Sequence, residues 1–127
     1  MTMEEVKKNL RENKYKPEFL PVPPIRRYPD DHVFDETKSV VWNREEVIRR
    51  NEEYVQAKKL NREREHNMDI LFSSDLREAL KTDYGFSSAQ VEFIYQNAYE
   101  EGHANGYYEV LYEAEKLADL VTEFMKL

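Results

Sequence analysis

Proline and glycine, the residues that interrupt helices, are confined to a few places in this sequence. All five prolines lie between Pro17 and Pro29, and no glycine precedes Gly85. Proline removes a helix hydrogen bond and clashes with the preceding turn, so the proline-containing stretch is expected to be extended. The chain beyond it is open to a long helix, and Asn43, followed shortly by two glutamates, suits the start of that helix.

A second helix start lies at Ser87. Ser87 and Gln90 fit a capping box, and Gly85 suits the left-handed residue that ends the preceding helix. The stretches 44–83 and 88–127 are each forty residues long. Folding between them predicts an all-α protein, a long antiparallel helical hairpin with helices at about 44–83 and 88–126.

Two glycines interrupt the second of these helices. Gly102 and Gly106 each weaken a helix by roughly 1 kcal/mol relative to alanine. The apolar stripe of the helix also shifts around its axis across residues 102–106. The helix either kinks or breaks there, and we favour a kinked, nearly continuous helix.

Residues 1–43 form the first expected domain, and residues 44–127, the helical hairpin, form the second. Thr2 and Glu5 fit a capping box before a short amphipathic helix, which an extended arm follows. The alternative interpretation of the arm is a polyproline ligand, because its sequence from Pro21 fits the PxxPxR pattern. The apolar residues of the arm predict that it docks, on the helices or on a second subunit; they are Phe19, Leu20, Val22, Ile25, Tyr28 and Trp42.

The composition argues against several classes of protein. The chain has no cysteine for a disulfide framework, and no apolar run approaches the ~18 residues of a membrane span. A net charge of −7 disfavours direct binding of nucleic acid. We find no nucleophile–base pair, phosphate loop or nucleotide fingerprint. We therefore expect a soluble, cytoplasmic, non-enzymatic protein without a cofactor.

The negative charge is concentrated towards the C-terminal end of the sequence. Residues 84–127 contain eight acidic and two basic side chains, a net charge of −6. Tyrosine is enriched in binding patches because it offers a large contact area at low entropic cost. The alternative is an ordinary solvated helix face with some tyrosines in the core. We predict a face that binds a protein partner, made of Glu100, Glu101, Tyr107, Tyr108, Glu109, Tyr112 and Glu113.

Two Glu-x-x-His sequences form a second candidate site. Glu63 with His66, and Glu100 with His103, each share one helix face at i, i+3 spacing. Such pairs on facing helices hold two-metal sites in four-helix bundles. In these four residues the chain resembles the ferritin-like di-iron proteins. The polar surroundings of the first pair favour the alternative, exposed histidines without a metal.

Three stretches, Gly85–Gln90, Ala98–Val110 and Lys38–Val47, resemble small accessory proteins of bacteriophages and prophages of Gram-positive bacteria. The resemblance implies a phage-encoded cytoplasmic protein of a class that often inhibits a host enzyme or defence complex. Our first hypothesis is an interaction protein that binds and inhibits a host nucleic-acid-handling or defence protein through its acidic helix. The second is a self-assembling structural protein, or a homodimer, whose arm docks on a neighbouring subunit. The third is a metal-binding bundle.

Overall fold

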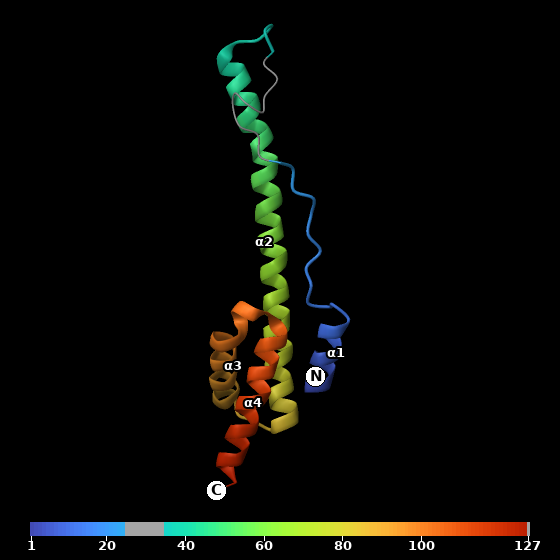
Figure 1. Cartoon of the computed structure of the whole chain (residues 1–127), viewed down its shortest axis with the longest axis vertical. Coiled ribbons are helices and arrows are strands. Elements are labelled where there is room, and N and C mark those ends of the chain that lie inside the picture. Colours follow the sequence, from blue (N-terminus) through green and yellow to red (C-terminus); the bar gives the residue numbers. More distant parts are fainter. Residues whose placement is uncertain (25–34, 127) are drawn as a thin grey trace. The chain divides into compact units, whose positions relative to one another are not determined.

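The computed structural model of this chain describes residues 1–24 and 35–126, and over these residues the chain is all-α, as predicted (Figure 1). Helices take up nearly all of the described chain beyond residue 39, and no strand occurs within the described ranges. The helices are α1 (Met3–Arg11), α2 (Val40–Tyr84), α3 (Ser88–Gly102) and α4 (Tyr107–Met125), with a 3₁₀ turn, η1 (His103–Asn105), between the last two. None of the described helices is both long and apolar enough to cross a membrane.

The chain divides into two compact units, and each is described by itself. The first contains residues 1–16 and 67–127, and the second contains residues 17–66. This division differs from the boundary expected at residue 43. The short N-terminal helix belongs with the C-terminal helices because its apolar face is buried in the same core as theirs.

The core of the first unit is shared by four helices. Each contributes a narrow apolar stripe at helical spacing, so that no single pair of helices has to bury the whole core. The buried residues include Val6 and Leu10 of α1, Phe72, Leu76 and Leu80 of α2, Val91, Ile94 and Ala98 of α3, and Val110, Leu111, Ala114 and Ala118 of α4.

The connection between α2 and α3 forms as the sequence predicts. Gly85 has a φ of 67°, in the left-handed region that glycine adopts without steric cost. The Ser87 hydroxyl accepts a hydrogen bond from the Gln90 amide, and the Gln90 side chain accepts one from the Ser87 amide. Arg77 of α2 and Glu92 of α3 are paired at 2.7 Å, which confirms the antiparallel arrangement about residues 85–87.

The second helix breaks at its two glycines, and the chain reverses there. α3 ends at Gly102 and α4 begins at Tyr107 after one 3₁₀ turn. Gly106 has a φ of 101°, which residues with a side chain rarely adopt. α4 then runs back alongside α3 (Figure 1). The expectation of a kinked, nearly continuous helix is therefore replaced by two antiparallel helices, although the place of the interruption is the predicted one.

A close backbone approach holds this reversal together. A Cβ atom placed on Gly102 would lie 2.7 Å from the Val110 nitrogen and 2.8 Å from the carbonyl carbon of Glu109. Such distances are too short for real contacts, so the last residue of α3 packs directly on the backbone of α4. Tyr107 donates a hydrogen bond to Asp69 of α2. α4 therefore returns along α2 in the direction of α2 itself, antiparallel to α3.

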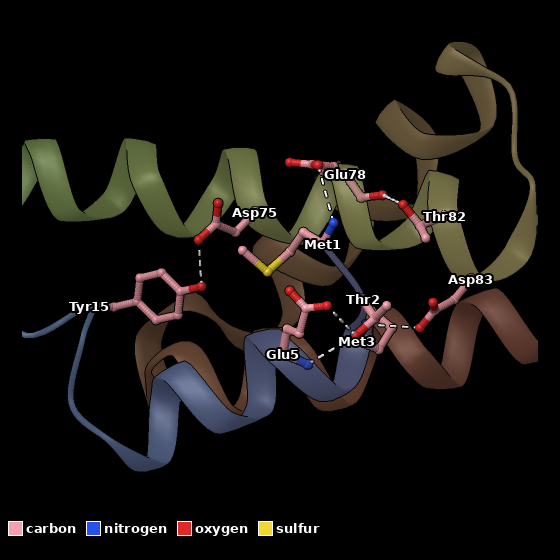
Figure 2. Close-up of polar contacts among 9 residues, drawn as sticks. All are labelled: Met1, Thr2, Met3, Glu5, Tyr15, Asp75, Glu78, Thr82 and Asp83. Carbon is pink, nitrogen blue, oxygen red and sulfur yellow. Dashed lines mark hydrogen bonds and ion pairs between the residues drawn. The ribbon is translucent and has the colours of Figure 1, made fainter.

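Polar contacts attach helix α1 to α2 (Figure 2), and Lys7 of α1 also forms an ion pair with Glu115 of α4. Thr2 caps the helix by accepting from the Glu5 amide, as predicted. The amino group of Met1 lies 3.2 Å from Glu78, and the Met3 amide donates to Asp83 at 2.8 Å. These acidic side chains of α2 meet the N-terminal end of α1, where the helix dipole favours negative charge.

Tyr15 fastens the segment that follows α1. Its ring is buried against Phe72, with ring centroids 5.3 Å apart, and its hydroxyl donates to Asp75 at 2.7 Å (Figure 2). Burial is the main cause that raises the pKa of Tyr15 to about 12. The hydrogen bond to Asp75 acts in the same direction, while the one from Asn9 lowers the pKa.

In the second unit, α2 begins four residues earlier than Arg44, where the sequence analysis placed its start. Ser39 precedes the helix, and its hydroxyl accepts a hydrogen bond from the Trp42 amide at 3.1 Å. Ser39 therefore makes the capping contact that was expected of Asn43. Trp42, expected in the arm, lies in the first turn of α2 with Lys38 over its ring.

We predict that Gly102→Ala destabilises the first unit. The added methyl group would meet backbone atoms that cannot move away as a side chain can, so the free energy of unfolding should fall by about 1–3 kcal/mol. Urea unfolding followed by circular dichroism measures this. Asn105→Ala, an exposed change in the same turn, should stay within about 0.5 kcal/mol of the parent. A Gly102→Ala protein as stable as the parent would contradict the close approach.

Tyr15→Phe should remove about 1 kcal/mol of stability at neutral pH, because it deletes a buried hydrogen bond. The pKa of Tyr15 is raised in the folded state, so its contribution is complete below the unfolded value near pH 10 and is lost as the pH rises towards 12. The stability difference between parent and variant should therefore shrink above pH 10 in urea unfolding series. The exposed change Tyr108→Phe serves as the control. A difference that is constant with pH would show that the Tyr15 hydroxyl is not held as described.

Candidate functional site

The outer face of the α3–α4 hairpin carries most of the predicted partner-binding residues. The core side of α4 is set by Val110, Ala114 and Ala118, which are all buried. Residues on the opposite side of a helix must then face solvent. Tyr108 and Tyr112, one turn apart, are 62% and 59% exposed.

A hollow lies between α3 and α4, lined by residues of both helices. Its volume is about 180 Å³. Its apolar walls are Ala98, Leu117 and the half-exposed Leu120. Polar side chains from both helices line it as well: Asn97 and Glu101 from α3, and Glu113 and Lys116 from α4. The arrangement offers an apolar surface for an alkyl chain and two carboxylates for a cationic group.

The structure separates the predicted acidic and aromatic residues into four groups, of which the exposed pair Tyr108 and Tyr112 is one. Glu101 and Glu113, twelve positions apart in sequence, meet at the same hollow. Glu100 is exposed and Glu109 half-buried, outside its lining. Tyr107 belongs to the core side: its ring stacks on Phe72 with centroids 4.3 Å apart. Tyr107 is therefore a packing residue, and we leave it out of the partner-binding face.

Sequence reasoning missed part of the hollow. Asn97, Lys116 and Leu120 line it but were not singled out as site residues. Their common position depends on the reversal at Gly106, and a continuous helix would have kept α3 and α4 residues far apart. The two glycines were the available signal: a helix break predicted there would have placed these residues of α3 and α4 side by side.

A column of aromatic rings supports α3 from the side of α2. Arg77 lies over the ring of Tyr95 at 4.1 Å, Tyr99 stacks on Tyr95, and His103 stacks on Tyr99. Burial raises the pKa of Tyr95, although Ser73 and Arg77 lower it. The Nδ1 atom of His103 lies 3.0 Å from the Tyr99 carbonyl oxygen. His103 is thus engaged in packing the end of α3.

The four candidate metal ligands do not form a metal centre in the described part of the chain. Glu63, His66, Glu100 and His103 are all exposed. Within the described ranges, no group of three or more His, Asp or Glu side chains is arranged to hold a metal ion. Within each unit, the geometry of the described residues gives no support to the resemblance to ferritin-like proteins.

The arm docks on α2 within the second unit, through its main chain. The Asn61 side chain accepts from the Leu20 amide at 2.7 Å and donates to the Leu20 carbonyl at 3.1 Å. Asn43 holds Asp35 in the same way, accepting from its amide at 2.9 Å and donating to its carbonyl at 3.2 Å. The two asparagines are eighteen residues apart, which is about five full turns, so they lie on the same face of α2.

The side chains of the arm that were predicted to dock differ in their exposure to solvent. Leu20 is docked, but Phe19 is 56% exposed and Val22 is 40% exposed. Ile25 and Tyr28 lie outside the described residues. The expectation that apolar side chains drive docking needs correction, because the hydrogen bonds to Leu20 hold the backbone and leave its neighbours facing outwards.

Comparison with known families gives a match over nearly the whole chain. The model of a family of unknown function, DUF8546, matches residues 4–122, which include all or nearly all of every helix. Searches of curated proteins and of solved structures returned no match.

Asn61→Ala should release the arm from α2, because both hydrogen bonds to Leu20 disappear. Only four residues of 17–24 have an amide proton, since the other four are prolines. Hydrogen exchange of the Leu20 amide, followed by NMR, should accelerate about tenfold or more. Lys59→Ala, an exposed change on the same helix, should leave the rate unchanged. Slow exchange retained in Asn61→Ala would contradict docking through the main chain.

Proposed function

The chain belongs to this family, whose function is unknown, and we propose that it is a non-enzymatic protein that binds a basic protein surface through the outer face of α3 and α4. The hollow between these helices supports the proposal, because it combines apolar walls with two carboxylates from different helices. Such a site suits the side chain of lysine or arginine, which has an alkyl stem and a cationic head.

Glu101 and Glu113 would supply the charge recognition. Glu113 is only half-exposed, so its attraction to a cation is screened less than that of a fully solvated carboxylate. A hydrogen bond to a charged group contributes roughly 1.5–3 kcal/mol when both partners are well placed. Guanidinium has the planar geometry to bond both carboxylates, which favours arginine over lysine.

Lys116 gives the site its selectivity. It lines the same hollow as the two carboxylates, so a surface that carries only positive charge would meet a like charge there. A partner with a cation for the glutamates and a carboxylate for Lys116 would fit in one register only. Charge patterns of this kind contribute to specificity and to association rate.

Tyr108 and Tyr112 would extend the contact beyond the hollow. Both rings are largely exposed on neighbouring turns of α4. Tyrosine rings have few rotatable bonds, so they provide contact area with little loss of entropy. The central hollow would then hold the anchoring side chain, while the tyrosines exclude water around it.

The resemblance to phage accessory proteins supports a host protein as the partner. We propose a host protein that handles nucleic acid or acts in defence, and whose basic groove is blocked by this face. The carboxylates on α3 and α4 compete with nucleic-acid phosphates for such a groove because both present spaced negative charge. The binding would therefore be protein to protein, without direct contact between this chain and nucleic acid.

The test uses a short synthetic peptide that contains arginine, leucine and aspartate, with a net positive charge, titrated into the ¹⁵N-labelled protein. Chemical-shift changes should be largest at Asn97, Glu101, Glu113 and Leu117. Glu101→Gln with Glu113→Gln should weaken binding about tenfold or more, since it removes a charge-assisted interaction worth at least about 1.4 kcal/mol.

The matched control is Glu100→Gln with Glu123→Gln. It removes the same two charges from exposed positions outside the hollow, and it should weaken binding by less than threefold. Equal losses in both double variants would mean that the peptide responds to net charge alone. That result, or shift changes spread evenly over the acidic residues, would overturn the proposed site.

A further inference from the structure

The docked arm creates a second hollow, in the unit of residues 17–66. Its volume is about 350 Å³. Phe19, Leu20 and Val22 of the arm form one wall, and Lys58, Asn61, Arg62 and Glu65 of α2 form the other. The arm wall is apolar, and the α2 wall has two cationic side chains, Lys58 and Arg62, together with the amide of Asn61 and the carboxylate of Glu65.

This hollow is a fixed feature because the backbone of the arm is pinned on either side of Phe19. Asn61 holds both main-chain groups of Leu20, and the Arg64 guanidinium donates to the Glu18 carbonyl. These bonds fix the backbone whatever the arm side chains do. Phe19 and Val22 are therefore held at the hollow although more than a third of each remains exposed.

The end of α4 exposes an aromatic ring and a carboxylate on neighbouring residues. Phe124 is 73% exposed, the highest value among the large apolar side chains that remain exposed in the described residues. Glu123, its neighbour in sequence, is exposed as well. An aromatic ring next to a carboxylate matches a hollow in which the apolar side chains of the arm face the cations of Lys58 and Arg62.

We propose that this chain self-associates head to tail. The last turn of α4 in one copy docks in the arm–α2 hollow of a second copy, with Phe124 against Phe19 and Val22, and Glu123 beside Lys58 and Arg62. The two contacting surfaces differ, so the contact is heterologous and repeats from copy to copy, giving a ring if it closes and a chain if it does not. This inference is independent of the proposed function, because it uses neither Glu101 nor Glu113.

The test is the mass of the full chain by sedimentation velocity over about a hundredfold range of concentration. The parent should increase in mass with concentration. Phe124→Ser and Arg62→Glu should each remain monomeric, since each removes one of the two surfaces. Phe93→Ser removes an exposed aromatic side chain from α3, outside both contacting surfaces, and should associate as the parent does. Circular dichroism confirms that each variant keeps its helices.

A mixing experiment identifies the geometry. Phe124→Ser retains the hollow, and Arg62→Glu retains the end of α4, so an equal mixture should form a one-to-one dimer that does not grow further. Glu123→Lys combined with Lys58→Glu and Arg62→Glu in one chain should restore association, because it reverses the charges on both sides of the contact. A parent that stays monomeric at every concentration would overturn the proposal. A mixture that remains monomeric would overturn it too. In a head-to-tail contact each variant supplies the surface that the other lacks, whereas a contact between two identical patches could not be restored by mixing.

The same measurements separate this inference from the proposed function. Glu101→Gln with Glu113→Gln should associate normally while losing the arginine peptide. Phe124→Ser should bind the peptide normally while remaining monomeric. If either variant lost both self-association and peptide binding, the two surfaces would not be independent. That result would overturn the proposed head-to-tail contact.

Discussion

The close approach of Gly102 to the backbone of α4 is the constraint on which the first unit depends. It lets the chain reverse within one 3₁₀ turn, so α3 and α4 lie in contact from end to end. In an unbroken helix, Glu101 and Glu113 would be about 18 Å apart along the axis and about 120° apart around it. The reversal brings both to one hollow. The candidate site therefore depends on the reversal of the chain between Gly102 and Gly106.

The reversal also decides which faces of the helices remain exposed. α3 and α4 each have one apolar stripe, and both stripes turn towards the core that α1 and α2 complete. The acidic side chains are left on the outside because charged groups are costly to bury unpaired. Core formation and the acidic surface are thus two consequences of one arrangement. A change that loosens the turn would disturb both, whereas a change to an outer glutamate affects only the surface.

Sequence reasoning succeeded where the signal was local. The N-cap at Thr2, the capping box at Ser87 and the left-handed Gly85 each depend on a few neighbouring residues, and the structure contains all three, although Thr2 and Glu5 form only one of the two hydrogen bonds of a capping box. It failed where the answer depended on distant packing. Two glycines in five residues are compatible with a kink or a reversal, and the choice is made by Val110 meeting the end of α3. Asn43 was expected to cap α2, but its side chain bonds the main chain of Asp35, which lies outside the helix. Ser39 makes the capping contact instead.

The arm shows a further limit of inference from apolar patterning. Its apolar residues predicted docking through side chains, but Asn61 and Asn43 grip main-chain atoms that every residue possesses. Hydrogen bonds to main-chain atoms require the arm to be extended but do not require particular side chains. The prolines on either side of Leu20 already favour this extended conformation. Docking therefore does not account for the apolar character of Phe19 and Val22. Exposed apolar side chains fixed on a rigid backbone lose little further entropy when they are covered, and this is the property expected of a contact surface.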